Sequence, residues 1–578
     1  MAEIVVGIDL GTTNSLIGAV VDGTCRLFAD PNGTELLPSV VSADPSGAIL
    51  VGRPAKNRRL MDPTGTVVSI KRLMGQTTEV RVGTKNLSPP QVSALILGAL
   101  LDRVEKELGA RPTRAVITVP AYFDDSQRQA TRDAGEMAGL AVERLVNEPT
   151  AAAMTYQTGQ EERVLVYDLG GGTFDVSILD RDEGFLEVKA SRGDTHLGGD
   201  DIDEGLTQLV LERLGTARAA IDSDPRARTR LVEAVERAKI ALSDRDEVRL
   251  FDPFLAGEGA DAVHLDVALT RDDVEKVARP FLERTLKCID DALRDAHRRP
   301  TEIDRVLLVG GSSKMPVVRQ MVSEHLGRPA QVDLDADRAV ALGASLLAGR
   351  AAGAAVEEIL VDITPHTLAI GALSAINSQE DVFDHSRLAA VAVIPRDTVV
   401  PVERTERFAT VSTNQTAVIF PVVQGEEPRV GQNTLLGEVE VGDLPPSPAH
   451  SPVDVTFRLD LSGVLNVLAK HVPSGRSATV IFSNSPYRLT EQRRRSARAE
   501  VEKLREKPVQ EDAVSDGELQ LAKAMVARAK RALEKPAEEA AQNKVREALT
   551  ALELAIENPS PLLGEATDAL SDALLDLI

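Results

Sequence analysis

A short motif, in which a buried strand ends in an aspartate, a leucine and a glycine turn, occurs twice in this chain. One copy spans residues 4–14 and contains Asp9; the other spans residues 164–175 and contains Asp168. Apolar runs closed by an acid and glycines are typical of strands that end in tight turns. Such turns bring backbone N–H groups close to anions such as phosphates. Because aspartates repel a polyphosphate, the motif also implies a divalent cation.

Either copy alone is explained at least as well by an ordinary structural turn, since glycine-rich turns often follow strands. Two copies favour two similar halves that face each other and clamp a nucleotide. After the first copy, residues 15–21 and the turn Asp22-Gly23 indicate a returning strand, so the phosphate loop joins two strands. The pattern Gly-x-x-x-x-Gly-Lys-Ser/Thr, which opens a helix, is absent from the sequence.

Size and charge limit the remaining possibilities. A length of 578 residues suggests three or four domains, and with 3% aromatic residues the cores must be largely aliphatic. The formal charge of −23 opposes attraction to nucleic acid or to an anionic membrane, so we predict neither partner. Cys25 and Cys288 are too isolated in the sequence for a disulfide framework or a zinc site.

The sequence also lacks the patterns of targeting and membrane segments. The N-terminal residues reach Asp9 after a short apolar run that does not resemble a signal peptide. The most apolar later stretch, residues 339–356, contains Arg350 and is too short to span a bilayer. We therefore expect a soluble protein in the cytoplasm.

The hydrophobic pattern changes twice along the chain. Up to about residue 350, strands alternate with helices, which is typical of an α/β fold. A capping box at Ser88 and a glycine stop at Gly109 delimit one of these helices. Residues 363–482 then alternate as half-buried strands do, as at Val455, Phe457, Leu459 and Leu461, and carry no visible chemistry. This pattern indicates an all-β binding module. Beyond Pro486, prolines separate amphipathic helical segments.

Four motifs, which follow one another along the chain, resemble the signatures of the DnaK-type (70-kilodalton heat-shock) chaperones. They are Asp9-Leu10-Gly11-Thr12-Thr13-Asn14, Asn147-Glu148-Pro149-Thr150-Ala151-Ala152-Ala153, Asp168-Leu169-Gly170-Gly171-Gly172-Thr173-Phe174-Asp175 and Gly193-Asp194-Thr195-His196-Leu197-Gly198-Gly199. The resemblance continues to about Ser485. It implies an actin-like α/β ATPase domain (the duplicated ribonuclease H-like type), then an all-β sandwich that grips extended peptides, then an α-helical lid. The expected boundaries are 1–355 for the ATPase domain, 356–362 for a hydrophobic linker, 363–486 for the sandwich and 487–578 for the lid.

The resemblance assigns roles in ATP hydrolysis, where positioning and charge neutralisation supply most of the catalysis. Lys71 reaches the terminal phosphate, Glu148 and Asp175 orient the water, and Thr173 contacts the phosphate. Asp9 and Asp168 hold hydrated Mg²⁺ and flanking K⁺. Without the resemblance, Lys71 would be read as a surface lysine and Glu148 as a helix N-terminal acid. The other contacts implied for ATP or ADP are Gly11, Thr12, Thr13, Gly170, Gly171, Gly172, Gly198, Gly199, Glu236, Lys239, Ser243, Gly310, Gly311, Ser312, Lys314 and Asp337.

The resemblance also implies partners. Extended peptide clients would lie on Phe408, Val411, Val418 and Phe420. A J-domain cochaperone would couple through Arg144, Asn147 and Asp362, and a nucleotide exchange factor is a further expected partner of a mostly monomeric protein. The linker is expected to dock on the ATPase domain when ATP is bound, because an apolar segment buried in one state costs free energy to expose in the other.

Several departures from the family pattern point to a short, divergent, HscC-like branch. The segment between Gly75 and Ser88 is short, so one outer subdomain should be small. Lys314 replaces a frequent arginine and lacks its planar guanidinium, which predicts weaker stacking on the base. Val411 and Phe420 are bulkier than usual, and residues 378–387 diverge where a groove loop is expected. Thr413 and Ala449 replace a charged lid latch, so closure of the lid is in question.

The sequence thus predicts an ATP-dependent stress-response chaperone with a narrow groove and a restricted set of clients. An actin-like small-molecule kinase would share the two phosphate loops, although it would need no β-sandwich or lid. An exchange factor or holdase that barely turns over is the other alternative, and the full set of expected catalytic residues argues against it.

Overall fold

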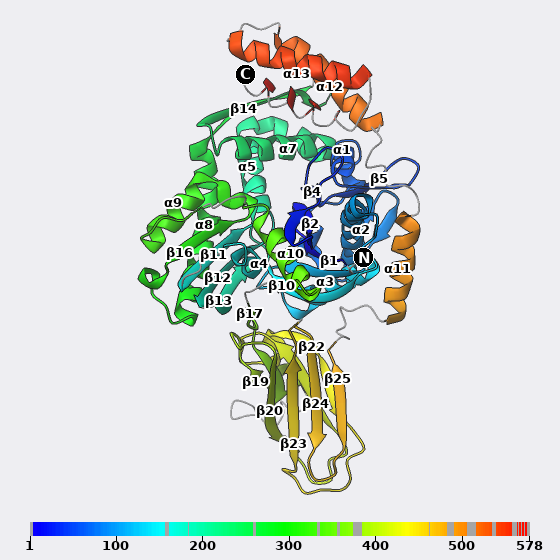
Figure 1. Cartoon of the computed structure of the whole chain (residues 1–578), viewed down its shortest axis with the longest axis vertical. Coiled ribbons are helices and arrows are strands. Elements are labelled where there is room, and N and C mark those ends of the chain that lie inside the picture. The colour runs from blue at the N-terminus through cyan, green and yellow to red at the C-terminus, as the bar shows by residue number, and fades with distance from the viewer. Residues whose placement is uncertain are drawn as a thin grey trace.

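Figure 1 shows a computed structural model of the chain. A two-lobed α/β part lies in the middle of this view, a β-sandwich lies below it and a pair of helices lies above it. The structure describes residues 4–156, 161–182, 184–257, 262–331, 336–354, 359–373, 384–461, 463–482, 491–505, 516–533, 539–557, 563, 566–567, 569–570 and 573–574.

The first lobe is built on a sheet and two long helices, which are β1 (Val5–Asp9), β2 (Asn14–Val21), β3 (Thr24–Leu27), β4 (Leu37–Pro38), β9 (Arg114–Val119), β10 (Ala141–Asn147), α2 (Pro89–Leu108) and α3 (Asp125–Met137). The strand order is β10-β9-β1-β2-β3, and β4 pairs with β2. The first Asp-Leu-Gly motif forms the antiparallel hairpin β1–β2, and β1 also pairs in parallel with β9. Side chains such as Ile8, Ile17 and Leu100 form an aliphatic core.

The second lobe has a sheet of the same design, which contains β11 (Glu162–Leu169), β12 (Phe174–Asp182), β13 (Phe185–Asp194), β16 (Arg305–Val309) and β17 (Ile359–Val361), in the order β16-β11-β12-β13-β17. Strand β11 is antiparallel to β12 and parallel to β16, as β1 is to β2 and β9. A parallel bridge between Leu307 and Gln331 takes the place that β10 has beside β9. The repeated motif therefore marks the same hairpin in two sheets of like order.

Helices surround the two sheets: α4 (Glu148–Ala153), α5 (Gly199–Leu214), α6 (Arg218–Ser223), α7 (Pro225–Ala241), α8 (Arg271–Asp295), α9 (Pro316–Leu326) and α10 (Ala339–Ala351). Helix α10 packs against β1, β2 and α4. A Cβ atom on Gly7 would lie 2.2 Å from the backbone nitrogen of Ser345. Because only glycine allows this approach, the motif-bearing strand β1 and α10 are fixed closely together.

The outer parts of the lobes are small. They contain α1 (Arg53–Arg59), η1 (Pro63–Gly65), η2 (Ile70–Leu73), β5 (Val41–Ala43), β6 (Ile49–Val51), β7 (Val80–Val82) and β8 (Lys85–Leu87) in the first lobe and β14 (Glu247–Ala256) and β15 (Val263–Thr270) in the second. The segment between Gly75 and Ser88 forms the short β7–β8 hairpin, in agreement with the small outer subdomain predicted from its length.

The β-sandwich consists of β18 (Leu368–Ala372), β19 (Ala389–Ile394), β20 (Val402–Ala409), β21 (Val418–Gln424), β22 (Thr434–Val441), β23 (Pro452–Leu459), β24 (Leu465–His471) and β25 (Ser477–Ile481). Its two sheets have the orders β19-β18-β21-β22 and β20-β23-β24-β25. Side chains from both, including Phe420, Phe457 and Phe482, form one core. The predicted alternation of buried side chains holds through Leu459 but not at Leu461, which lies beyond the strand and is 47% exposed.

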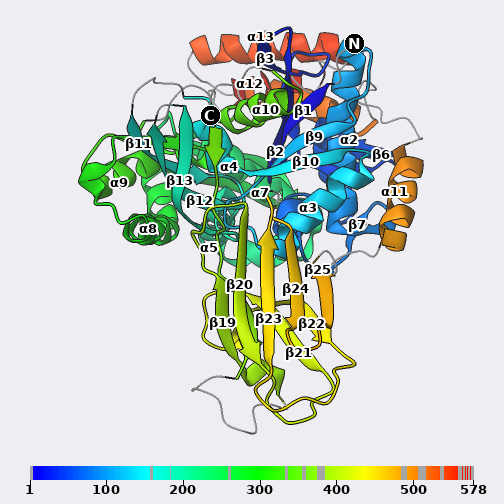
Figure 2. The same cartoon turned by 60° about the horizontal axis from the view of Figure 1, so that its bottom comes forward.

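The longer helices described after the sandwich are α11 (Glu491–Arg505), α12 (Asp516–Leu533) and α13 (Glu539–Glu557). Helix α11 packs against α2 and α3 of the first lobe, and Figure 2 shows it beside that lobe rather than over the sandwich. Helices α12 and α13 share a core of their own. The prolines predicted to separate these helices (Pro486, Pro508, Pro536, Pro559 and Pro561) lie outside the described residues, as do residues 378–383 of the divergent groove loop.

Candidate functional site

The turns of the two repeated motifs lie against each other. A Cβ atom on Gly171 would lie 2.0 Å from Thr13 Oγ1, and one on Gly172 would lie 2.6 Å from Thr12 Cγ2. Residues larger than glycine would force the turns apart. The two loops thus approach as the repeated motif predicts, with backbone N–H groups and hydroxyls from both sides available to an anion.

A cluster of charged side chains lies at the ends of the motif strands. Lys71 Nζ is 2.5 Å from Glu148 Oε1, and both side chains are buried. Asp168 and Asp175 are buried too, and they are paired in register across β11 and β12. Asp9 is partly exposed at the end of β1 and accepts a hydrogen bond from Thr118 Oγ1 at 2.9 Å.

The cluster carries more acids than bases. Burial and the nearby Glu148 carboxylate raise the pKa of Asp9 and that of Asp175 each to about 7. The same two causes raise the pKa of Asp168. Burial alone would lower the pKa of Lys71, but Glu148 and Asp9 outweigh it, and the pKa is raised. These carboxyl groups would therefore gain from an added positive charge.

Oxygen donors of this kind suit Mg²⁺, which keeps several of its own waters. In the part of the chain that the structure describes, no three His, Cys, Asp or Glu side chains converge as a ligand cluster. The donor set fits a hydrated cation held through water and phosphate better than one enclosed by protein ligands.

The lobes are also joined by residues that sequence reasoning missed. Arg72 Nε donates to the Gly172 carbonyl at 3.0 Å, and its Nη2 pairs with Asp201. Ser69 Oγ donates to Asp200 Oδ2 at 2.7 Å. The only signals in the sequence were the position of Arg72 beside Lys71 and the two acids after Gly199.

The residues predicted to hold adenosine are partly engaged with one another. Lys239 Nζ donates to Asp203 Oδ2 at 2.8 Å and to the Gly199 carbonyl at 3.3 Å. Glu236 and Ser243, which lie near Lys239 in the sequence, are partly exposed. Lys239 is thus tied to the base of α5 rather than extended from the helix.

The third glycine turn lies against the second motif. A Cβ atom on Gly310, where φ is +83°, would lie 2.5 Å from the Leu169 carbonyl oxygen, and Ser312 Oγ donates to the Gly170 carbonyl at 2.9 Å. Lys314 Nζ lies 2.5 Å from Asp337 Oδ2. A Cβ atom on Gly198 would lie 2.4 Å from the Gly171 carbonyl oxygen, and one on Gly199 2.4 Å from Ser312 Oγ. These predicted contacts are therefore adjacent in space.

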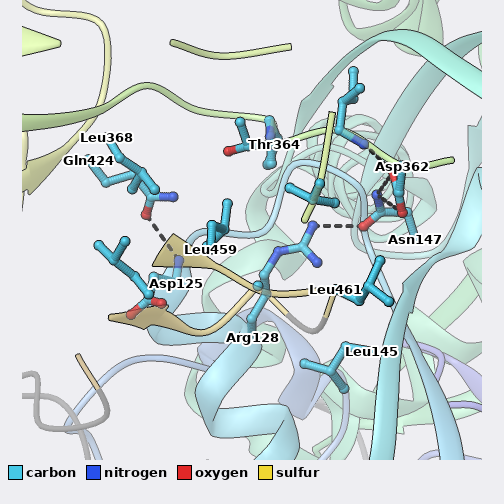
Figure 3. Close-up of a pocket in the computed structure, with 15 residues that line it drawn as sticks. Asp125, Arg128, Leu145, Asn147, Asp362, Thr364, Leu368, Gln424, Leu459 and Leu461 are labelled. Atoms are coloured by element: carbon cyan, nitrogen blue, oxygen red, sulfur yellow. Dashed lines mark hydrogen bonds between the residues drawn. The ribbon is translucent and has the colours of Figure 1, made fainter. Parts of the chain in front are cut away.

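The predicted linker adds a strand to the second sheet. Residues 356–358 lie outside the described residues, and Ile359–Val361 forms β17, which pairs in parallel with β13. Leu360 is buried in the core beneath. Asp362 follows, and its two carboxylate oxygens accept from Asn147 Nδ2 at 2.9 and 3.0 Å (Figure 3).

Asn147 in turn joins the linker to the first lobe. Arg128 Nη2 donates to Asn147 Oδ1 at 2.7 Å (Figure 3). Burial lowers the pKa of Arg144, with the charge of Asp362 acting in the opposite direction. Two guanidinium nitrogens of Arg144 are buried without a hydrogen-bond partner. Asn147 and Asp362 are therefore bonded as a pair, Arg144 acts on Asp362 only through its charge, and Arg128 was not predicted.

The same region connects the lobes to the sandwich. A cavity of about 40 Å³ lies there, lined from both sides by residues that include Arg128, Asp362 and Leu461. The Asp125 backbone N–H donates to Gln424 Oε1 at 3.0 Å (Figure 3). Arg192 Nη2 pairs with Asp397 at 3.2 Å. The sandwich and the lobes thus share a polar, hydrogen-bonded interface.

The four predicted groove residues have different surroundings. Val418 and Phe420 are buried in the sandwich core, Phe408 packs against that core, and Val411 is 48% exposed. The rings of Phe408 and Phe420 lie 5.5 Å apart between centroids. Two of the four predicted groove residues are therefore core side chains, the third packs against the core, and Val411 faces solvent.

Comparison with known sequences gives this architecture a family. The sequence profile described as Hsp70 protein matches residues 5–80 and 76–576. The chain belongs to the Hsp70 family. Proteins of this family are ATPases that drive a chaperone cycle, and this Hsp70 is an ATP-dependent chaperone. The comparisons support neither the small-molecule kinase nor the slow-turnover holdase.

Curated relatives agree with this assignment. Chaperone protein DnaK of Thermotoga petrophila is 42% identical over 492 residues, covering 83% of this Hsp70 and 80% of the relative. Chaperone protein DnaK of Mycoplasmoides gallisepticum is 41% identical over 493 residues, covering 83% and 81%. That of Thermotoga neapolitana is 41% identical over 501 residues, covering 85% and 82%. Within the described residues, no helix combines the length and apolarity needed to cross a membrane.

Proposed function

We propose that residues 1–355 form an actin-like ATPase domain of the duplicated ribonuclease H-like type, with residues 356–362 as the linker, 363–486 as the peptide-binding sandwich and 487–578 as the lid. The matching order of the two sheets supports the duplication. The change to antiparallel sheets from β18 onward supports the start of the sandwich.

ATP would bind between the two motif turns. Thr12, Thr13 and the glycines of both turns would contact its phosphates, and Lys71 would neutralise the terminal one. Asp9 and Asp168 would hold hydrated Mg²⁺, which adds positive charge where negative charge develops, with K⁺ beside it. Glu148, Asp175 and Thr173 would orient the attacking water. The buried pair of Lys71 and Glu148 supports these roles, because it fixes a cation and an acid beside the two glycine turns.

At the outer end of the cleft, Glu236, Lys239 and Ser243 would hold the adenosine. Gly310, Gly311, Ser312, Lys314 and Asp337 would line the base and ribose. Lys239 would have to exchange part of its bonding with Asp203 for the ligand. Lys314 would stack less well than an arginine, because its ammonium is not planar.

The docked linker would correspond to the ATP-bound, peptide-releasing arrangement, and α11 lies on the first lobe in it. The bonded series Arg128–Asn147–Asp362 is the observation that carries this proposal. It joins the first lobe to the linker at the place where the sandwich begins. Hydrolysis would free the linker through differential contacts in the two states. A J-domain cochaperone would act on Arg144, Asn147 and Asp362.

The protein would work as a monomer in the cytoplasm, with a nucleotide exchange factor and a narrow range of extended, apolar peptide clients. The contact between the rings of the predicted groove residues Phe408 and Phe420 supports a restricted groove. The absence of a charged pair at Thr413 and Ala449 supports a lid that closes weakly.

The decisive experiment measures release of a fluorescent peptide after ATP is mixed with the preformed complex, with and without a J-domain protein. We expect ATP to accelerate release and the J-domain protein to stimulate hydrolysis. Peptide off-rates that do not respond to ATP would contradict the proposed coupling, even if nucleotide binds.

A further inference from the structure

Helices α12 and α13 lie across the outer ends of both lobes (Figure 1). Helix α12 packs against α1 of the first lobe. From the same helix, Arg528 Nη2 donates to the Phe251 carbonyl of β14 in the second lobe at 2.6 Å. One helix therefore contacts both sides of the candidate nucleotide cleft.

The two outer ends already approach each other beneath α12. Segment η1 of the first lobe packs against α7 of the second. Glu233 of α7 is buried and interacts electrostatically with Arg59 and Lys56 of α1. Helix α7 continues from Glu233 to Lys239, which belongs to the candidate adenosine site. The junction is therefore within about two helical turns of that site.

Helix α12 can dock on the lobes and leave them, because the C-terminal helices have a hydrophobic core of their own. Residues such as Ala522, Ala529 and Leu552 form a core shared only by the C-terminal helices. Helix α11 differs, because its Val501 and Leu504 belong to the core of the first lobe. The α12–α13 pair can thus leave the lobes without exposing a core on either side.

Arg528 is held at this contact among mixed charges. Burial lowers the pKa of its guanidinium. The positive charges of Arg237 and Arg230 lower this pKa further, and the negative charge of Asp252 raises it. Asp252 also pairs with Arg230. The Phe251 carbonyl and the Asp252 carboxylate therefore attract Arg528 to β14, whereas the positive charges of Arg230 and Arg237 repel it.

We propose that α12 clips the outer ends of the two lobes together and slows the escape of nucleotide from the cleft. The α12 contact exists only when the lobes are close, so its free energy stabilises the closed cleft. Nucleotide can leave only after that contact breaks. By the same linkage, bound nucleotide stabilises the docking of α12. This inference rests on the proposed nucleotide site and adds a control on the retention of ATP before hydrolysis that the chain carries within itself.

The test uses the full-length protein, Arg528→Ala, a variant that lacks residues 516–578, and Arg531→Ala as the matched control. Arg531 is on the same helix, is exposed, and donates to Ala527 of its own helix. The off-rate of a fluorescent, non-hydrolysable ATP analogue is measured by stopped-flow chase without peptide. We expect Arg528→Ala and the deletion to raise it about tenfold, the effect of losing one hydrogen bond to a charged group, and Arg531→Ala to leave it unchanged.

A second measurement follows backbone hydrogen exchange in α12 with and without the non-hydrolysable ATP analogue. We expect the analogue to slow exchange in this helix in the full-length protein and in Arg531→Ala but not in Arg528→Ala. An off-rate for the deletion variant within about twofold of the full-length protein would overturn the inference. If the full-length protein bound no ATP analogue at all, the proposed function would fail together with this inference. Normal binding of the analogue with an unchanged off-rate in the deletion variant would overturn this inference alone.

Discussion

Lys71 and Glu148 form a buried ion pair, with 2.5 Å between Nζ and Oε1. Lys71 comes from η2 and Glu148 from the first turn of α4, so the pair holds two separate segments of the first lobe together. Asp9 and Asp168 also act on the charge of Lys71. Its ammonium is thus shared among these acids, and a phosphate would have to share it as well.

Replacing Lys71 with alanine should abolish ATP hydrolysis and leave nucleotide binding largely intact. The glycine turns and hydroxyls remain, whereas loss of a positioned charge typically slows the chemical step about 100- to 1000-fold. Single-turnover hydrolysis and nucleotide affinity would be measured in parallel. Lys287→Ala, an exposed lysine on α8, is the matched control. Hydrolysis at the normal rate in Lys71→Ala would contradict the assigned role.

Asp362→Ala should uncouple peptide release from ATP while hydrolysis continues. The substitution removes the acceptor of both Asn147 hydrogen bonds and leaves the buried Arg144 without its opposing charge. We expect the linker to dock poorly and ATP to lose most of its effect on the peptide off-rate. Glu440→Ala, at an exposed position on β22, should behave as the unmodified protein. Full ATP-triggered release from Asp362→Ala would show that the linker docks by other contacts.

Acidification should weaken the docking of the sandwich through His366. His366 Nε2 lies 3.2 Å from the Tyr122 carbonyl, and burial lowers the pKa of its imidazole below 6.5 despite that hydrogen bond. Asp124 and Glu426 favour the charged ring, and Arg128 opposes it. Because the docked state has the lower pKa, docking is fully stable above the undocked pKa of about 6.5 and weakens as pH falls through it.

The measurement is protease protection of the linker in ATP between about pH 5.5 and 7.5, the range in which histidine titrates. His366→Leu has an apolar side chain of similar size that cannot titrate. Protease protection of the linker in this variant should therefore change less with pH. Equal pH dependence in both proteins would assign the effect to other groups.

Arg505→Ala should release α11 from the first lobe. Arg505 Nη2 pairs with Asp102 at 2.6 Å and donates to the Gly98 carbonyl at 3.3 Å. A Cβ atom on Gly98 of α2 would lie 2.5 Å from Arg505 Nε, so the absence of a side chain at this position lets the arginine of α11 lie against α2. Fluorescence energy transfer between α11 and α2 should fall. Arg498→Ala is the control, because Arg498 pairs with Glu502 of its own helix. Unchanged transfer in Arg505→Ala would mean that Val501 and Leu504 suffice.

Val411→Ala should broaden the range of peptides bound. Val411 is half-exposed, so its truncation should cost little stability and should widen the groove beside the Phe408–Phe420 pair. Phe420→Ala should instead destabilise the sandwich by about 3–5 kcal/mol, because Phe420 is in its core. A peptide array and thermal denaturation would separate the two effects. An array pattern identical to that of the unmodified protein would contradict the narrow-groove hypothesis.

Local features were the easiest to predict. The capping box at Ser88 and the left-handed Gly109 delimit α2 as expected, and a second box begins α3 at Asp124. Such signals depend on hydrogen bonds between residues three or four apart, which the sequence displays directly. The strand ending at Leu459 was extended too far, because an exposed leucine in a loop satisfies the same alternation as a buried one.

Contacts between distant segments were harder to predict. Arg72 with Asp201, Arg128 with Asn147, and Arg528 with Phe251 join residues far apart in the chain. Each would be an ordinary charged surface residue by sequence alone, because long side chains of this type are usually exposed. Only the packing of the lobes, linker and C-terminal helices brings their partners within reach.

The sequence by itself determined the two strand-and-turn motifs, the glycines where backbones meet and the change from α/β to β structure, since these depend on local conformation and on which side chains avoid water. The tertiary structure decided that the linker joins the edge of the second sheet, that α11 lies on the first lobe and that α12 spans both lobes. Those arrangements compete with undocked ones that leave the same local structure intact, and the choice rests on a few long-range bonds worth only a few kcal/mol.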